Sequence, residues 1–138
     1  MAKLSVNGLD SLMLSLEQVA AIPDDVVRDM LDAEAQVVEE AQVATGMQMG
    51  VYRTGETLRS IRRGKLKKDR DGIRTVSITF SGTNDKGERN AAVAFINEYG
   101  KRGQPARPFI ATANAAAADS AVEEAEKVYN KFLQDKGF

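Results

Sequence analysis

Residues 94 to 113 constrain the fold of this chain more than any other stretch. The sequence there is AFINEYGKRGQPARPFIATA. Gly100 can take a positive φ that other residues resist, while Pro105 and Pro108 each fix φ and remove a backbone hydrogen-bond donor. The chain must therefore turn sharply and reproducibly between an apolar segment and the pattern that follows it.

The second half of this stretch predicts the start of the last helix. Pro108 suits the first position of a helix, and Phe109 directly behind it can anchor the base of that helix in a core. Arg107 and the Lys101-Arg102 pair would then lie outside. On local residues alone, a loop-to-helix corner and a functional site explain this stretch equally well.

Two long helical patterns dominate the rest of the chain. From residue 23 to about residue 44, apolar residues recur at three- and four-residue spacing, which predicts a helix of roughly 33 Å. Its apolar stripe consists of Val27, Met30, Leu31, Val37, Val38 and Ala41. The last pattern ends near Gly137 and is lined by Ile110, Ala113, Ala117, Ala121, Ala125, Val128 and Phe132. Its alanines permit a close neighbour, either within the subunit or between subunits.

Shorter helical segments are expected on either side of the first long helix. Asn7 or Asp10 can cap a short helix whose apolar positions are Leu9, Leu12, Met13, Leu16 and Val19. Thr45-Gly46 and Met47 to Gly50 should break the long helix. Thr54 can then cap a helical turn that directs Leu58 and Ile61 inward.

The middle of the chain predicts a β-hairpin. Residues 69–72 read DRDG, where Gly72 supplies the left-handed residue of a tight turn. Residues 73–80 alternate strictly, which is typical of a half-buried antiparallel strand with Val76, Ile78 and Phe80 facing one way.

A polar loop and a further apolar segment follow the hairpin. Residues 81–90 lack periodicity and predict a mobile loop. Residues 91–99 predict a helix presenting Ala92, Phe95, Ile96 and Tyr99, with a third strand as the alternative. The expected fold class is α+β, a small hairpin-based antiparallel sheet packed against two long helices in one domain spanning residues 1–138.

The net charge of −1 conceals a segregation along the sequence. Residues 1–50 carry a net charge of −7, residues 51–114 carry +8, and residues 115–138 carry −2. Such segregation points to partners of opposite charge, either nucleic acid or acidic faces of neighbouring copies. The near-zero total argues against a free-standing DNA-binding protein, because affinity for a duplex comes chiefly from neutralised phosphates.

The charged side chains form two groups. The acids opposite the apolar stripe of the long helix are a solvated face or, alternatively, an assembly surface: Asp25, Asp29, Asp32, Glu39 and Glu40. The basic centre is either a strand edge protected from aggregation or a contact surface. It consists of Arg59, Arg62, Arg63, Lys65, Lys67, Lys68, Arg70 and Arg74.

The composition excludes the common catalytic and metal-binding chemistries. The chain has neither Cys nor His, which rules out thiolate nucleophiles, disulfides, zinc sites of the usual ligands and histidine acid–base catalysis. Adjacent carboxylates such as Glu39 and Glu40 point about 100° apart on a helix and cannot share one site. The glycines match neither of the common phosphate-binding patterns. We therefore expect no enzymatic activity and no cofactor.

The hydropathy of the chain predicts a protein that is made and stays soluble in a cytoplasm, without membrane contact. The N-terminal residues MAKLSVNGLD contain no apolar run long enough for a signal peptide. Nowhere do about eighteen consecutive apolar residues occur.

Several short motifs follow one another along nearly the whole chain. They are Gly8-Leu9 with Leu12, the long helix, Thr54-Gly55 followed by Ser60-Ile61, the basic hairpin, Phe95 with Glu98-Tyr99-Gly100, and Ala106 to Ile110 with Ala113. Their order and spacing resemble the head-tail joining family of long-tailed bacteriophages and prophages, also called tail-completion, neck or minor tail component proteins. Two positions depart from the family pattern: Thr57 stands where members usually have Leu, and Lys101 where they often have Thr.

The resemblance implies a small structural subunit, not an enzyme, that forms a ring between the portal-connector and the tail tube. Its implied partners are further copies of itself, the connector or stopper protein and the tail-tube or terminator protein, with nonspecific contact to DNA in the channel. The implied location is the neck or tail of the virion, after synthesis and assembly in the cytoplasm of the bacterial host. A tail terminator, a component of a phage-tail-like particle and a nucleic-acid-binding protein are the alternatives.

Two versions of the ring contact follow from the charges. The acidic helix, residues 24–40, packs against a basic surface of a neighbour, or the basic hairpin faces the DNA channel. The candidate interface residues are Glu98, Tyr99, Gly100, Arg107, Pro108 and Phe109 at the corner, Arg62, Arg63 and Lys65 in the basic centre, and Asp25, Asp29 and Asp32 on the helix.

Overall fold

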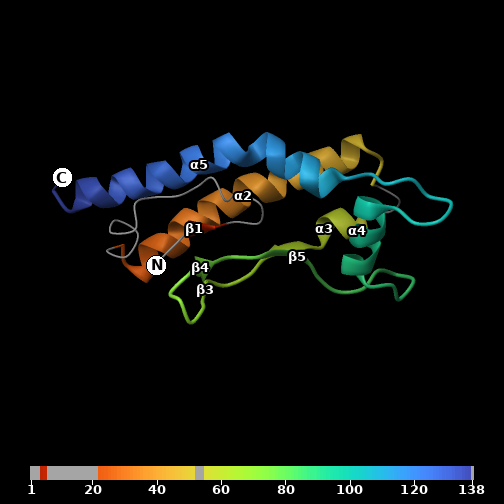
Figure 1. The fold of residues 1–138 in the computed structure, drawn as a ribbon, viewed down its shortest axis with the longest axis horizontal. Coiled ribbons are helices and arrows are strands. Elements are labelled where there is room, and N and C mark those ends of the chain that lie inside the picture. Colours follow the sequence, from red (N-terminus) through yellow and green to blue (C-terminus); the bar gives the residue numbers. More distant parts are fainter. Residues whose placement is uncertain (1–3, 6–21, 52–54, 138) are drawn as a thin grey trace.

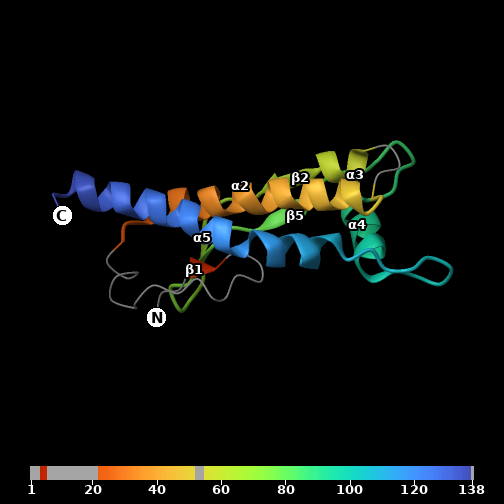
Figure 2. The same ribbon diagram turned by 90° about the horizontal axis from the view of Figure 1, so that it is seen from above.

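Two long helices form the frame of the molecule. The computed structural model describes residues 4–5, 22–51 and 55–137 (Figure 1). Helix α2 (Asp24–Gln48) and helix α5 (Phe109–Asp135) lie side by side and run in opposite directions, as Figure 1 and Figure 2 both show. The short strands lie along one side of this pair, so the fold is α+β as predicted. The short helix expected from Asn7 or Asp10 lies outside the described residues.

Alanines set the packing of the two long helices. Ala113, Ala117, Ala121 and Ala125 recur every fourth residue of α5 and are all buried. Side chains of this size let the backbones approach closely, so the larger residues of α2 fill the core around them. The buried apolar residues of α2 are Val27, Met30, Leu31, Ala35 and Val38. The prediction of an alanine-lined inner face of α5 is thus confirmed, and its close neighbour lies within the subunit.

Helix α2 continues past the point where the sequence predicted its end. The break was expected over residues 45–50, after a helix ending near Ala44, but the helical residues run to Gln48. Gly46 is buried, and a Cβ at this position would lie 2.7 Å from Cδ2 of Leu58 and 3.2 Å from Cδ2 of Phe109. The glycine is therefore a packing residue that admits two large side chains, and the chain turns only at Gly50, where φ is +81°.

The strands form two small sheets. In the first, β1 (Leu4–Ser5) is parallel to β4 (Arg74–Thr75), which is antiparallel to β3 (Lys67–Lys68). In the second, β2 (Ile61–Arg63) is antiparallel to β5 (Ile78–Phe80).

The predicted tight turn between β3 and β4 is present. Gly72 has a φ of +79°. The Asp69 carboxylate accepts hydrogen bonds from the backbone N–H groups of Asp71 and Ile73, both at 2.9 Å. This arrangement satisfies turn donors locally and fixes the register of the hairpin.

The single strand predicted for residues 73–80 is divided in two. Residues 64–66 lie opposite residues 76–77 between the paired segments, so three residues face two and the ladder is interrupted as in a β-bulge. The predicted inward alternation nevertheless holds. Val76 and Ile78 are buried and Phe80 is half-buried.

Two short helices complete the molecule. Helix α3 (Glu56–Arg59) buries Leu58 as predicted, whereas its proposed cap, Thr54, lies outside the described residues. Helix α4 (Asn90–Tyr99) confirms the helical alternative for this segment. The loop before α4 is held by Asn84, whose side-chain oxygen accepts hydrogen bonds from the N–H groups of Lys86 and Glu88.

Candidate interaction surface at the α4–α5 corner

Glu98 connects the end of α4 to the start of α5. Its side chain is buried, and its two carboxylate oxygens accept hydrogen bonds from the backbone N–H groups of Ile110 at 2.8 Å and Ala111 at 3.0 Å. The first N–H groups of a helix have no partner within the helix, and the helix dipole favours a negative charge beside them. The carboxylate of Glu98 therefore fixes where α5 begins.

The loop between the two helices is tightly bonded. Gly100 has a φ of +79°, and a Cβ there would lie 2.8 Å from the backbone nitrogen of Ala106. Lys101 and Gln104 exchange two backbone hydrogen bonds at 2.9 and 3.0 Å. The N–H of Arg107 donates to the carbonyl of Asn97 at 2.6 Å, so the returning chain is fastened to α4.

The predicted interface residues at the corner fall into two sets, one buried and one exposed. Glu98 and Phe109 are buried inside the subunit, and Phe109 is fully enclosed, as the sequence predicted for the base of α5. Tyr99, Arg107 and Pro108 are exposed. The outside position predicted for Lys101 and Arg102 is confirmed as well. The corner thus has buried residues that hold α4 and α5 together and exposed residues at the protein surface.

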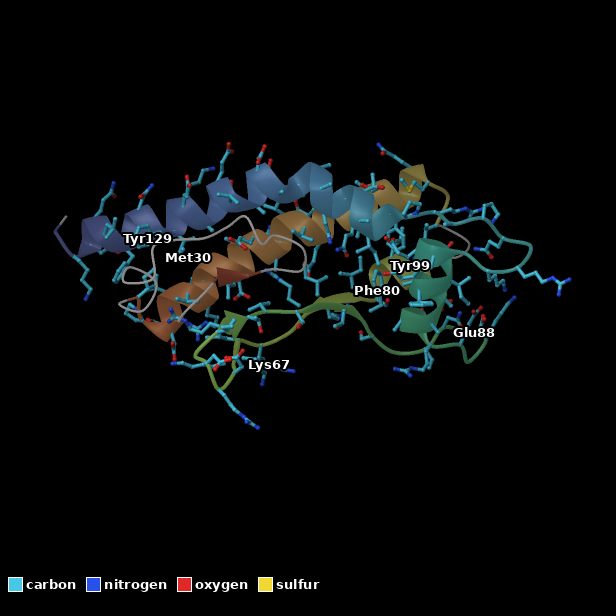
Figure 3. All side chains as sticks on the ribbon, in the orientation of Figure 1. Met30, Lys67, Phe80, Glu88, Tyr99 and Tyr129 are labelled. Carbon is cyan, nitrogen blue, oxygen red and sulfur yellow. The ribbon has the colours of Figure 1, made fainter. Side chains whose placement is uncertain are left out.

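Two aromatic rings on α4 lie exposed and in contact. Phe95 is 62% exposed and Tyr99 is 69% exposed, with their ring centroids 4.7 Å apart. They border an open groove of about 520 Å³, whose other lining residues include Phe80, Ala94, Ile110, Ala111 and Ala115. Figure 3 shows Tyr99 and Phe80 at the same end of the molecule.

The sequence found this aromatic stripe of α4 but not the direction in which it faces. Asn90, Ala94, Asn97 and Glu98 are the buried residues of α4. Three of these are polar and are held by hydrogen bonds, for example from the Asn90 side chain to the carbonyl of Ser81 at 2.9 Å. Hydrophobicity alone predicts that the aromatic face is the inner one. The one available signal was Glu98, which precedes a turn and a helix start that need an acceptor.

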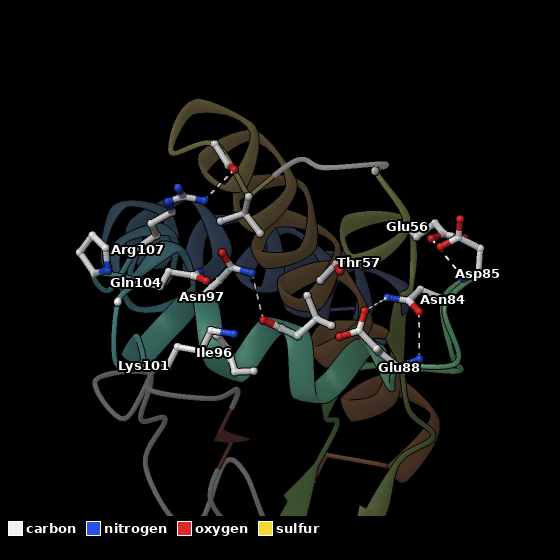
Figure 4. A pocket seen from close by; sticks show the side chains of 16 residues that line it. Glu56, Thr57, Asn84, Asp85, Glu88, Ile96, Asn97, Lys101, Gln104 and Arg107 are labelled. Carbon is white, nitrogen blue, oxygen red and sulfur yellow. Dashed lines mark hydrogen bonds between the residues drawn. The ribbon is translucent and has the colours of Figure 1, made fainter.

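A polar cleft of about 440 Å³ lies on another side of α4 (Figure 4). Glu56, Asp85 and Glu88 line one end, and Lys101 and Arg107 line the other. Several of its side chains are engaged with the protein itself: Arg107 donates to the carbonyl of Gly50 at 3.1 Å, and Asn97 to the carbonyl of Val93 at 3.0 Å. Within the described part of the chain, no cluster of three or more acidic side chains is placed to hold a metal ion.

The basic centre contacts the acidic helix of its own chain. Arg63 lies 3.5 Å from the carboxylate of Glu39 and donates to the backbone carbonyl of Asp32 at 3.1 Å. Asp24 pairs with Arg74 at 3.0 Å and with Lys68 at 3.7 Å. Part of the charge segregation seen in the sequence is therefore neutralised inside one subunit.

Exposure separates the charged candidates further. Arg74 was grouped with the basic surface, but it is only 3% exposed and donates to the carbonyl of Ile22 at 2.8 Å, so it is a core residue. The candidate interface bases Arg62, Arg63 and Lys65 are exposed, as are the other members of the basic centre apart from Arg74. Asp25 and Asp29 are also exposed, whereas Asp32 is half-buried.

Glu34 is a buried acid that sequence reasoning missed. It is fully enclosed, and neither carboxylate oxygen has a hydrogen-bond partner among the described residues. Burial raises its pKa from the usual 4.5 to about 8, because the charged form loses its hydration. The signal was present in the sequence, since Glu34 lies three and four residues beyond Leu31 and Met30 on the apolar stripe.

Comparisons with known proteins leave the family of this chain open. No family model, curated protein or solved structure matches it. Among the described residues, no helix has the length and apolar character needed to cross a membrane.

Proposed function

We propose that this chain is a structural subunit of a tailed phage or prophage, forming a ring at the head–tail junction that joins the connector to the tail tube. The proposal starts from the ordered motifs that resemble the head-tail joining family. One structural observation supports it most: Glu98 of the first corner motif is hydrogen-bonded to Ile110 of the second. The two motifs therefore act as one unit, and beside it lies an exposed aromatic rim, formed by Phe95 and Tyr99.

Such a subunit acts by binding its neighbours in the particle, and the surfaces described above can make these contacts. The antiparallel pair α2 and α5 is a stiff rod, because its core is formed by interlocking side chains along most of its length. The corner presents Phe95 and Tyr99 at one end of this rod. The hairpin presents exposed bases along its side, including Lys65, Lys67 and Arg70.

Of the two ring contacts, we favour the one in which the hairpin faces the DNA channel. Asp24 and Glu39 on the acidic helix already pair with bases of their own chain. The helix therefore has less unpaired charge to offer a neighbour than the sequence suggests. Lys65 and Lys67 on the hairpin are exposed and form no ion pair within the described residues, so their charge is available for passing phosphates.

Electron microscopy of particles from a strain that lacks this gene tests the proposal. Full heads beside separate, finished tails are the expected result. Tails of abnormal length would move the function to tail termination. Unchanged, infectious particles would rule out a role in joining.

A nucleic-acid-binding protein is the second candidate, supported by the exposed bases of the hairpin. This function requires the free protein to bind DNA with an affinity that falls as salt is added. A gel-shift assay at low salt distinguishes the two candidates. A joining subunit is expected to show weak binding or none, because its net charge is −1.

A further inference from the structure

The hairpin strands have one face in the core and one face turned away from the helices. Ile61, Leu66, Val76 and Ile78 pack in the core with residues of α2 and α5. The residues between them face the opposite way, because successive side chains of a strand alternate between its two faces. Figure 1 shows the strands on the side of α2 away from α5, and Figure 3 shows Lys67 on the side of the molecule opposite α5.

One strand carries a row of hydroxyls on this outer face. The hydroxyls belong to Thr75, Ser77 and Thr79, which alternate with the buried Val76 and Ile78. Thr79 is exposed and the other two residues are half-buried. None of the three hydroxyls forms a hydrogen bond with the described part of the chain. Three donors are therefore available to a partner.

The neighbouring strand places lysines beside this row. Lys67 lies directly opposite Thr75, and Lys65 lies in the bulge two residues earlier. Both lysines are exposed and form no ion pair within residues 22–51 and 55–137. Arg62, opposite Thr79, is instead bonded to nearby backbone carbonyls at 2.7 and 2.8 Å. Lys65 and Lys67 therefore supply the charge that this face offers to a partner.

No acid interrupts the outer face. Residues 61–68 and 74–80 contain neither Asp nor Glu. The acids closest in sequence, Asp69 and Asp71, lie in the turn beyond β3, where the Asp69 carboxylate is occupied by two backbone N–H groups. Lysines and the hydroxyls of Ser and Thr are side chains that contact phosphate oxygens in protein–DNA complexes. The face thus complements an anion that has several oxygen acceptors.

The outer face favours nucleic acid over an acidic protein surface, because it has no apolar anchor. Its outward positions hold hydroxyls and bases, whereas contacts between proteins are centred on buried aromatic or aliphatic side chains. Without an aromatic ring, the face cannot stack on bases, so its contacts are with the backbone of the nucleic acid. Successive hydroxyls are about 6.6 Å apart, since an extended chain advances about 3.3 Å per residue. A chain of phosphates that runs along the strand would meet them in turn.

We propose that this outer face binds the phosphate backbone of duplex DNA without reading its sequence. Lys65 and Lys67 neutralise phosphates, and the hydroxyls of Thr75, Ser77 and Thr79 donate to phosphate oxygens. This inference deepens the proposed function, because it names the residues of the hairpin and the chemical group of the DNA that meet in the channel. It rests on the proposed function only for the role of the contact in particles.

An NMR titration of the full chain with a short DNA duplex at low salt tests the contact. NMR detects weak binding that a gel shift misses, and weak binding is expected because the net charge of the chain is −1. The backbone amide signals of residues 65–67 and 75–79 should shift, while those in the middle of α5 should not. AT-rich and GC-rich duplexes should bind equally, since phosphate contacts carry no sequence information.

Three titration results would overturn the proposal. Absence of shifts at every DNA concentration would mean that the face does not bind DNA. Shifts confined to other residues would place the DNA elsewhere on the molecule. A clear preference for one duplex sequence would mean that bases are read.

Lysine variants test whether the charge acts at this face. Lys65→Gln with Lys67→Gln should reduce the slope of log affinity against log salt by about 1.8, because each phosphate contact contributes about 0.9. Lys131→Gln with Lys136→Gln is the matched control, since it removes the same charge at exposed positions near the end of the chain. The control should keep the slope of the wild type. An equal reduction by both double variants would show that net charge, and not this face, determines binding.

Threonine variants test the hydroxyls without changing the charge. Thr75→Val with Thr79→Val keeps the shape of both side chains and should weaken binding about fivefold or more, because the donors to the phosphate oxygens are lost. The salt slope should stay the same. Thr112→Val, at an exposed position on α5, should bind like the wild type. Unchanged affinity of the folded double variant would contradict the role of the hydroxyls.

Polyglutamate distinguishes a phosphate backbone from an acidic protein surface. At equal concentration of charge, it should shift the amide signals of this face less than DNA does, because it contacts the lysines but does not offer a chain of phosphates. Stronger binding of polyglutamate than of DNA would mean that an acidic protein is the partner and would overturn the proposal.

The titration and the particle experiment can fail independently. DNA binding at this face together with normal particles from the deletion strain would keep the contact and reject the joining function. Unjoined heads and tails together with no shifts in the titration would keep the function and reject the contact.

Discussion

At the scale of single residues, the most unusual feature is the ionisable group of Glu34. The folded protein binds the Glu34 proton more tightly than the unfolded chain, because burial raises the pKa to about 8. The contribution of this group to stability is therefore fully present below its usual pKa of 4.5 and is lost as the pH rises toward 8. The maximum slope is about 1.4 kcal/mol per pH unit.

Replacing Glu34 by Gln should remove this pH dependence. The variant stays neutral at every pH, so its free energy of unfolding should exceed that of the wild type by a margin that grows from about pH 5 to about pH 8. Urea unfolding across this range measures the difference. Glu40→Gln, an exposed substitution on the same helix, should run parallel to the wild type. Parallel profiles for Glu34→Gln as well would show that Glu34 ionises normally.

Gly100 and Gly103 offer a matched pair for testing the corner. Both have positive φ, but a Cβ at Gly100 would meet the backbone of Ala106 at 2.8 Å, whereas a Cβ at Gly103 would meet nothing within 4 Å. Gly103→Ala should cost about 1 kcal/mol from backbone strain alone. Gly100→Ala should cost about 2 kcal/mol more, because backbone atoms must move. Equal losses in thermal or urea unfolding would mean that the corner is not tightly packed.

At the scale of elements, the start of α5 depends on one side chain from another helix. The backbone N–H groups of Ile110 and Ala111 both donate to Glu98. Pro108 was expected at the first position of the helix, but it lies just before it, and proline has no side-chain acceptor for the first turn. The cap is thus a tertiary contact, which local sequence patterns do not describe.

Glu98→Ala should therefore release the first turn of α5. We expect a loss of about 2 kcal/mol of stability, since two partly buried N–H donors lose a charged acceptor. Hydrogen exchange of the Ile110 and Ala111 amides should accelerate, while amides in the middle of α5 change much less. Glu98→Gln retains one acceptor oxygen and should be intermediate. Unchanged exchange at the first turn would contradict the capping role.

The limits of prediction at this scale have a common cause. Period alone identified α2, α4, α5 and the buried alanines, because an exposed and a buried face alternate along each helix. Periodicity did not predict that α2 continues past Gly46, nor which face of α4 is buried. Contacts with distant residues decide both. The space that Gly46 provides for Leu58 and Phe109, and the hydrogen bonds that draw Asn97 and Glu98 inward, exist only once the elements have met.

At the scale of the whole molecule, the charge pattern of the sequence predicted less of the structure than the hydrophobic pattern did. The sequence showed an acidic and a basic block, and the natural inference was an attraction between subunits. In the fold, Arg63 and Arg74 form ion pairs with acids of their own chain, so part of the charge is neutralised within one subunit. The aromatic rim of α4 is also exposed, and the sequence did not predict this because it did not show which face of α4 is buried.

The proposed joining function makes the aromatic rim essential for particle assembly. A strain that lacks the gene can be supplied with the wild-type protein, with Phe95→Ser plus Tyr99→Ser, or with Met47→Ser. The wild type and Met47→Ser should restore joined particles, because neither alters the rim. The double variant should not restore them, provided that its folding is confirmed by circular dichroism.

The most direct test of the account is the count of joined particles in electron micrographs of these complemented strains. We predict tailed, infectious particles with the wild type and with Met47→Ser, and full heads beside separate finished tails with the double variant. Normal joining by the double variant would contradict the assembly surface. Normal joining in the strain that lacks the gene would contradict the function itself.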